Sequence, residues 1–258
     1  MTGLQRFLFS FFVFGALIAL WALCSQQNWV NSFLLPSPQM VWKSFWSLIA
    51  SGKLADHAGI SITRVLTGYA IAALLALALS LAMAASRILA AVIDPPLDFL
   101  RQVPPLALMP LAMLWLGIGE TQKVGIIVLA CFFPIFLGFR GGFSQVDPKL
   151  IEVGRVAGFS RTELLRRIAL PAALPAIIVG LRLGLGYGWR ALVGAELIAS
   201  SAGLGYMILD AQDLARTDIV MVGILVIGSI GLLADWGLKA LVRRTLPWIR
   251  QDLELGNG

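Results

Sequence analysis

Apolar runs of about 20 residues recur along this chain, and they constrain its fold more than any other feature. Such a run has the length of a helix that crosses a lipid bilayer. Because lipid offers no partners to backbone N–H and C=O groups, each run must be helical, and the alternation of a membrane barrel is absent. Hydrophobic residues fill 59% of the 258 positions and charged residues only 13%. The sequence therefore predicts an all-α integral membrane protein.

Six transmembrane helices are expected. They cover roughly residues 7–25, 62–86, 98–117, 122–140, 173–197 and 218–241. The first run is longer than a usual signal-peptide core and lacks its cleavage site, so it is interpreted as an uncleaved span. With the N-terminus inside, the inner segments carry thirteen Lys and Arg and the outer segments five, among them Arg64 and Lys123. This asymmetry places both termini in the cytoplasm of a multi-pass protein of the cytoplasmic (inner) membrane. It also accounts for the net charge of +6 without nucleic-acid binding.

No segment outside the spans is long enough to form a core of its own. We therefore expect one transmembrane domain over residues 1–258. Its parts are a core over about 56–242, a first span with a following short helix over 7–52, and a cytoplasmic loop over about 141–171.

The short helix between the first two spans has an apolar face formed by Val41, Phe45, Leu48 and Ile49. This pattern predicts an amphipathic helix lying in the periplasmic interface of the membrane. A short re-entrant or packed helix is the alternative interpretation.

The segment EVGRVAGFSRTELLRRIALP, residues 152–171, is strongly charged although predicted spans lie on both sides of it. Asp147 and Pro148 predict a helix start just before it, since proline is tolerated in a first helical turn. Gly158 then suits a turn that requires a positive φ. The first half of this loop is thus predicted to be a helix followed by a tight turn.

Ser160 and Glu163 have the spacing of a capping box, which opens a second short helix. That helix is expected to end before Leu170 and Pro171. Two helices and a tight turn exceed what membrane orientation alone requires. The residues by themselves leave open whether the loop is a docking surface or only an ordered connection.

The spacing E-V-G-x-x-x-G-x(9)-I-x-L-P, from Glu152 to Pro171, resembles the EAA loop of ATP-binding-cassette (ABC) importer permeases. Val153 and Gly154 stand where that family usually has two Ala, a variation in size rather than in chemistry. In the family this loop forms a coupling helix that docks into a groove of the ATPase subunit. The resemblance implies a coupling role for Glu152, Val153, Gly154, Ala157, Gly158, Phe159, Ser160, Glu163, Ile168, Leu170 and Pro171.

The resemblance covers roughly residues 30–248 and is closest to the branch that imports sulfonates, taurine, nitrate and related small solutes. The stretches that carry it are LLPSPQMVW, RQVPPLALMPLAMLWLGIGET, LPAALPAIIVGLRLGLGYGW, LVGAELIAS, GLGYMI and TDIVMVGI. It implies a permease that works as a homodimer with two ATPase subunits and a periplasmic or lipoprotein solute-binding protein. The implied solute is a small anion, first an aliphatic sulfonate, then taurine, nitrate or a vitamin precursor.

The chain lacks a phosphate-binding G-x-x-x-x-G-K-[ST] motif, because Gly52-Lys53 has neither the preceding Gly nor the following Ser or Thr. ATP and Mg²⁺ are therefore expected in the partner ATPase, and this chain is expected to bind no cofactor. No catalytic triad, paired-carboxylate site or metal-ligand cluster is evident, so neither an enzyme nor a metal site is expected. The rival function is an ion-coupled secondary transporter, for which Asp235 and Glu196 would be the intramembrane carboxylates.

Small residues recur every three to four positions in the fifth predicted span. They are Gly180, Gly184, Gly188, Ala191 and Ala195. Such a stripe lets helices approach closely in lipid, either within one chain or against a second copy. Arg182, Trp189 and Glu196 fall on roughly the opposite face, where they could line a path for an anion or pair with neighbouring helices. Arg190 is expected to point elsewhere.

Three prolines, Pro104, Pro105 and Pro110, interrupt the third predicted span and could form a hinge or a fixed kink. Asp235 lies deep in the last span. It is expected to be a hydrogen-bonded structural carboxylate rather than a proton relay.

Overall fold

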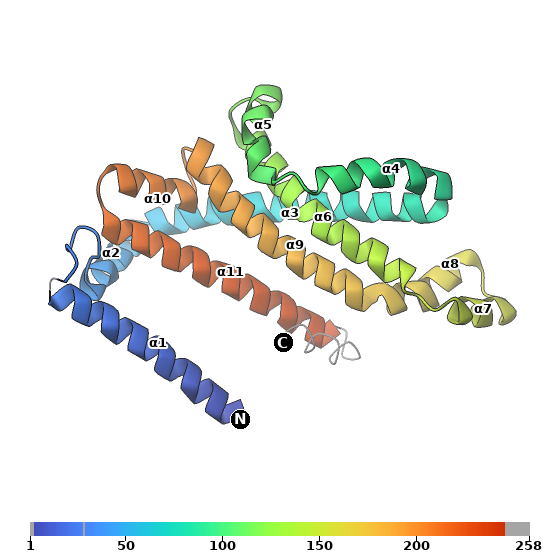
Figure 1. Ribbon diagram of the computed structural model, residues 1–258, viewed down its shortest axis with the longest axis horizontal. Helices are drawn as coiled ribbons and strands as arrows, with labels where there is room; N and C mark the ends of the chain where they lie inside the picture. The colour runs from blue at the N-terminus through green and yellow to red at the C-terminus, as the bar shows by residue number, and fades with distance from the viewer. Residues whose placement is uncertain (1–2, 28, 246–258) are drawn as a thin grey trace. The chain divides into compact units, whose positions relative to one another are not determined.

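The computed structural model describes residues 3–27 and 29–245, and the regular structure of those residues is entirely helical (Figure 1). The α-helices are α1 (Gly3–Gln26), α2 (Pro38–Ala50), α3 (Lys53–Ala85), α4 (Arg87–Leu100), α5 (Met109–Leu116), α6 (Glu120–Ser144), α7 (Pro148–Val156), α8 (Arg161–Leu164), α9 (Leu170–Ala199), α10 (Leu204–Asp213) and α11 (Thr217–Thr245). A 3-10 helix, η1 (Pro105–Leu108), precedes α5, and a π-helix, η2 (Leu165–Ala169), precedes α9. The all-α prediction is confirmed for the described residues.

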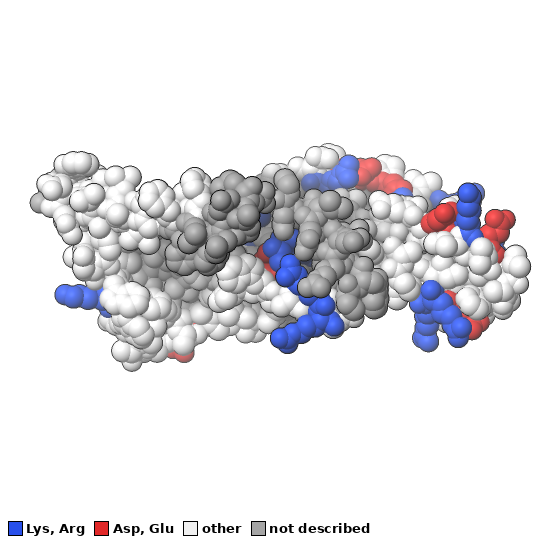
Figure 2. All heavy atoms as spheres, turned by 90° about the horizontal axis from the view of Figure 1, so that it is seen from below, with Lys and Arg blue, Asp and Glu red and all other residues white. Residues whose placement is uncertain are grey.

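Four helical stretches of the described chain are long and apolar enough to cross a membrane: α3, α6, the run Arg161–Ala199 and α11. The helices α4 and η1–α5 would make a fifth span if the bent pair counts as one. Within α1, Gly15–Gln26 is a shorter apolar helix. Most of the described surface visible in Figure 2 is uncharged, as a chain surrounded by lipid requires.

The third predicted span, residues 98–117, is interrupted at its prolines as expected, and its first helix begins earlier than predicted, at Arg87. The helices Arg87–Leu100 and Pro105–Leu116 meet at 88°. Pro104 is extended, with φ −60° and ψ 128°, and cannot donate an N–H to a preceding helical turn. A proline also disfavours the helical conformation of the residue before it. The first two prolines of the segment therefore separate two helices rather than bend one.

The chain forms two compact units. One contains the described residues up to Ile60 together with Ser201–Ser229, and the other contains Ser61–Ser200 together with the described residues from Ile230 on. In the second unit α6 and α9 lie side by side (Figure 1). Ile127, Ile135 and Leu192 are almost fully buried in its core.

In the first unit, hydrogen bonds tie α2 and the N-terminus of α11 together. Ser44 of α2 donates to the carboxylate of Asp218, which also accepts from Arg216 Nη2 at 2.7 Å. That hydrogen bond raises the pKa of the Arg216 guanidinium above its ordinary value. The buried face of α2 consists of Val41, Ser44 and Leu48, whereas Ile49 of the predicted apolar face is 41% exposed. Val41 and Leu48 of the predicted face are thus buried, but the third buried residue, Ser44, is polar and is hydrogen-bonded to Asp218. A pattern based on apolar residues does not include such a position.

Also in the first unit, the loop before α10 contacts the start of α3. The backbone N–H of Gly203 donates to His57 Nδ1 at 3.1 Å. Gly203 has φ +114°, a conformation that residues with a Cβ rarely adopt. The helix α3 begins at Lys53, well before the predicted start of the second span near residue 62.

Candidate functional site

The chain between α6 and α9 folds into a compact helical segment, which we call the α7–α8 segment (residues 147–171). The Asp147 carboxylate accepts a hydrogen bond from the Lys149 N–H at 2.8 Å and so caps α7. At the other end Gly158 has φ +80° and donates its N–H to the Arg155 carbonyl oxygen at 3.0 Å. The predicted tight turn at Gly158 is confirmed.

The predicted capping box at the start of α8 is also confirmed. The Glu163 N–H donates to Ser160 Oγ at 3.3 Å, and the Ser160 N–H donates to Glu163 Oε2 at 3.0 Å. Two backbone donors that a helix start leaves without intrahelical partners are thereby satisfied. The turn and the capping box together fix the direction in which the chain enters α8.

The predicted end of the second loop helix before Leu170 is wrong. The helix α8 continues through η2 into α9, so that Arg161–Ala199 forms one helical run of 39 residues. Pro171 lacks an N–H and its ring crowds the carbonyl one turn earlier. A π turn just before it changes the register of the backbone hydrogen bonds, so the helix passes Pro171 without a break. The α7–α8 segment is thus continuous with α9.

Gly154 brings α7 close to the residues that lead into α9. A Cβ added there would lie 2.5 Å from Leu164 Cδ2 and 2.5 Å from Ile168 Cδ1. Both atoms are the ends of flexible side chains, so a larger residue would require Leu164 and Ile168 to change their packing. Two positions of the recognised spacing, Gly154 and Ile168, are therefore brought together.

The other side of α7 is exposed. Val153 is 66% exposed and Val156 is 88% exposed, and Glu152 and Ala157 are also exposed. Phe159 lies in the turn, with the guanidinium of Arg167 stacked 5.2 Å from its ring centroid. Exposed apolar residues on a short, rigidly held helix are typical of a surface that another protein covers.

The small-residue stripe of α9 packs within the chain, against α6 and α5. A Cβ at Gly180 would lie 2.7 Å from Gly138 Cα, and one at Gly184 would lie 2.5 Å from Ile135 Cγ1. Gly188 lies against Cys131 in the same way. Further along the stripe, Ala191 and Ala195 pack in a cluster with Met109, Ile126 and Ala130.

In the second unit, α3, α9 and α11 surround a cavity of about 860 Å³. Its walls are mainly aliphatic, and its charged and aromatic members are Arg182, Trp189, Arg190 and Asp235. Gly231 leaves room for the indole, because a Cβ there would lie 3.0 Å from Trp189 Nε1. Arg182 and Trp189, predicted to share a face, thus line one cavity.

Arg182 is held in an ion pair within this cavity. Its Nη2 donates to Asp235 Oδ2 at 3.2 Å, and Lys239 Nζ lies 3.0 Å from the same oxygen. Asp235 is hydrogen-bonded, as predicted. Pairing of Arg182 with a neighbouring helix, the alternative to path lining, is likewise observed.

The prediction that Arg190 points elsewhere is wrong. Arg190 lines the same cavity as Arg182 and Trp189, and its Cζ lies 5.3 Å from the centroid of the Tyr187 ring. Its position on α9 is about 80° from Arg182 around the helix axis. The cavity is wide enough for both arginines to line it despite this angle. The residue pattern of a single helix does not reveal the width of a cavity between helices.

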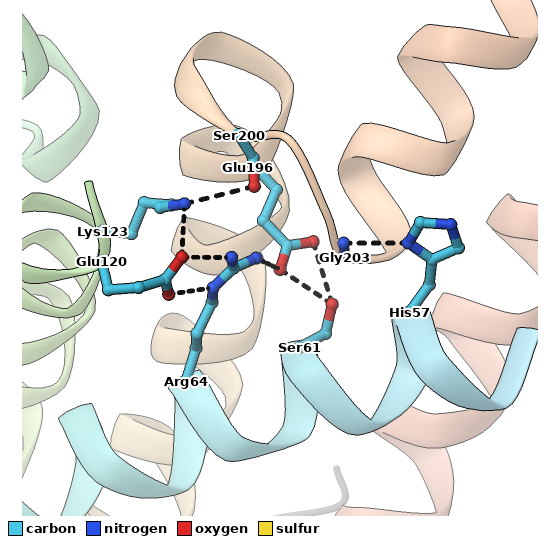
Figure 3. A network of polar contacts seen from close by, with 8 residues as sticks. All are labelled: His57, Ser61, Arg64, Glu120, Lys123, Glu196, Ser200 and Gly203. Carbon is cyan, nitrogen blue, oxygen red and sulfur yellow. Dashed lines mark hydrogen bonds and ion pairs between the residues drawn. The ribbon is translucent and has the colours of Figure 1, made fainter. Parts of the chain in front are cut away.

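Glu196 does not join this cavity but belongs to a buried charged network (Figure 3). Arg64 donates from Nη1 to Glu196 Oε1 at 2.7 Å, and from Nε and Nη2 to both oxygens of Glu120 at 2.6 Å. Lys123 Nζ donates to Glu120 Oε1 at 2.8 Å, and Ser61 Oγ donates to Glu196 at 2.8 Å. The network joins α3, α6 and α9.

Sequence reasoning missed this network. Arg64 and Lys123 are not topology charges of outer loops, because both lie on helices and are only 4% and 3% exposed. Their helices begin at Lys53 and Glu120, so Arg64 and Lys123 lie within α3 and α6 and their side chains are buried between packed helices. The available signal was charge balance, since two cations and two carboxylates at the same ends of three spans can neutralise one another.

Comparison with known proteins places these features in a family. The pattern of the family described as "Binding-protein-dependent transport system inner membrane component" matches residues 68–247. The chain is 40% identical over 234 residues to the Bacillus subtilis "Putative aliphatic sulfonates transport permease protein SsuC", covering 91% of this chain and 85% of that protein. It is 37% identical over 239 residues to the Escherichia coli "Taurine transport system permease protein TauC", covering 91% and 87%.

A solved structure described as an amino acid ABC transporter has the same fold. The TM-score is 0.59 at 18% identity, with 77% of this chain and 95% of the other covered. At this identity the likeness concerns the fold alone. The family match spans more than half of the chain and includes the α7–α8 segment and the small-residue stripe. The chain therefore belongs to the family of inner membrane components of binding-protein-dependent transport systems, the permease subunits of ABC importers.

Proposed function

We propose that the α7–α8 segment docks into an ATPase subunit and transmits its movement to the spans. The observation that carries this proposal is the exposed apolar side of α7, with Val153 and Val156, on a helix held rigidly at Gly154. The same positions fall within the spacing from Glu152 to Pro171 that resembles the EAA loop. Because α8 continues into α9, a force applied to α7 would reach the fifth span directly.

The proposed complex contains two copies of this chain, two ATPase subunits and an extracytoplasmic solute-binding protein. Each copy has six spans and both termini in the cytoplasm. ATP and Mg²⁺ belong to the ATPase, since this sequence has no phosphate-binding motif. Closure of the ATPase pair would move the α7–α8 segments and turn the spans from inward-facing to outward-facing.

The proposed solute is a small anion, first of all an aliphatic sulfonate. Relatives named for aliphatic sulfonates and taurine are 40% and 37% identical to this chain, and a Synechocystis relative named for nitrate import is 31% identical. The cavity beside α9 combines arginines with aliphatic walls. That combination suits an anionic headgroup on a short apolar tail better than an inorganic ion.

Transport in liposomes tests the proposed energy source. The chain would be reconstituted with its ATPase and binding protein, and uptake of radiolabelled ethanesulfonate measured with ATP inside the vesicles. We expect uptake only when both ATPase and ATP are present. Uptake driven by an ion gradient without the ATPase would instead establish the rival function, a secondary transporter.

Substitution of Gly158 by Pro tests the docking role. Proline fixes φ near −65° and has no N–H, whereas Gly158 has φ +80° and donates to Arg155. We expect the ATPase to be lost from the purified complex while membrane insertion is retained. Gly52→Pro is the matched control, because Gly52 also has a positive φ of 77° and donates its N–H, to Ile49 at 2.9 Å. If both variants retain the ATPase equally well, the docking role is wrong.

A further inference from the structure

We propose that Arg190, rather than Arg182, is the cation that recognises the anionic headgroup of the solute in the cavity beside α9. The inference rests on the proposed function, because it names the binding residue for the proposed solute class. It follows from the different partners of the two arginines, which line one cavity on the same helix. Roughly 12 Å of helix axis separates them, so each offers a distinct binding position.

Arg182 already has a carboxylate partner. Both oxygens of Asp235 accept from its guanidinium, and Lys239 approaches the same carboxylate at 3.0 Å. An anion that bound Arg182 would have to displace a carboxylate of the protein or lie close to it. Either event opposes binding, because like charges repel most strongly where water is scarce.

Arg190 has no such competitor. Among the described residues, no carboxylate forms an ion pair with its guanidinium, which instead lies over the Tyr187 ring at 5.3 Å. Stacking on an aromatic ring leaves the in-plane N–H donors of a guanidinium available for a planar or tetrahedral oxyanion. Arg182 and Lys239 share the Asp235 carboxylate, and Arg190 adds a further cation to the lining, so the charged groups at the cavity sum to a net positive charge.

The walls of the cavity favour a particular kind of anion. Ile62 and Leu66 of α3 and Ile230 of α11 contribute aliphatic surface, and Trp189 contributes an aromatic face. An alkyl chain attached to the headgroup would bury against these side chains, and each methylene buried adds to the affinity. The cavity therefore discriminates in favour of an alkanesulfonate over nitrate, which has no apolar part.

Direct binding to the full-length chain in complex with its ATPase, in nanodiscs, tests this assignment. The probe is 1-pentanesulfonate, titrated calorimetrically into wild type and into Arg190→Gln. Removal of a charge-assisted hydrogen-bond donor is expected to weaken binding about tenfold or more, whereas Arg190→Lys should retain most of it. Asp235→Asn removes the competing negative charge and is expected to tighten binding several-fold.

Arg190→Gln is thus expected to weaken binding and Asp235→Asn to strengthen it. General destabilisation of the protein would weaken binding in both variants. Wild type that binds no 1-pentanesulfonate up to 50 mM, or Arg190→Gln that binds as well as wild type in a folded, monodisperse complex, overturns the inference. A loss confined to Arg182→Gln would also overturn it. ATP-dependent uptake by wild type with unchanged uptake by Arg190→Gln refutes the role of Arg190 alone, whereas uptake without the ATPase refutes the proposed function.

Discussion

Replacement of Arg64 by Leu is expected to destabilise the helix packing by about 3–5 kcal/mol, the largest effect of any single substitution in the charged network. The side chain of Arg64 is 5% exposed, and that of its partner Glu196 is not exposed at all. Without the guanidinium, Glu196 keeps its hydrogen bond from Ser61 but loses its ion pair with Arg64. A buried charge that loses its counter-ion is far more costly than the ion pair is stabilising.

Thermal unfolding of the purified full-length variants in detergent measures this effect. Asp98→Asn is the control, because the side chains of the Asp98–Arg101 pair are 65% and 40% exposed and water can screen the change. The double variant Arg64→Leu/Glu196→Leu removes both buried charges and should recover much of the loss. If Arg64→Leu unfolds at the wild-type temperature, or the double variant is no more stable than Arg64→Leu, the pair does not hold the helices in this way.

The helical character of the spans could be predicted because it follows from local properties. Apolar runs set the helices that cross the membrane, and the turn at Gly158 and the capping box at Ser160 depend on residues only a few positions apart. The interruption at Pro104 was expected, but its 88° bend and the passage of the helix beyond Pro171 could not be predicted in the same way. Proline interrupts a helix in one case and is accommodated by a π turn in the other, and packing around each decides which.

The candidate site was predicted only in part for a related reason. Periodicity on one helix placed Arg182 and Trp189 together, and they do line one cavity. It could not show that Asp235, on another helix, forms an ion pair with Arg182, or that Arg64 forms one with Glu196. Ion pairs between spans depend on which helices are neighbours, and that information lies in tertiary packing rather than in any single run.

Substitution of Gly180 by Ala is expected to separate α9 from α6 and to destabilise the chain by about 1–3 kcal/mol. The added methyl would lie 2.7 Å from Gly138 Cα and 2.8 Å from the Pro134 carbonyl oxygen. Both of these atoms belong to the backbone of α6, so no side-chain rotation can relieve the overlap. The two helices must move apart, and the buried contacts on both sides of the glycine pair are loosened with them.

Gly186→Ala provides the matched control on the same helix. A Cβ at Gly186 would meet only Arg190 Nη2, at 3.9 Å, an ordinary contact with the end of a long side chain. Alanine also has a higher helix propensity than glycine, so this variant should be as stable as wild type or slightly more stable. In detergent, the thermal unfolding midpoint of Gly180→Ala should therefore fall below that of wild type, while that of Gly186→Ala should stay the same or rise. Equal midpoints for the two would mean that the close approach of α6 and α9 at this glycine pair does not determine stability.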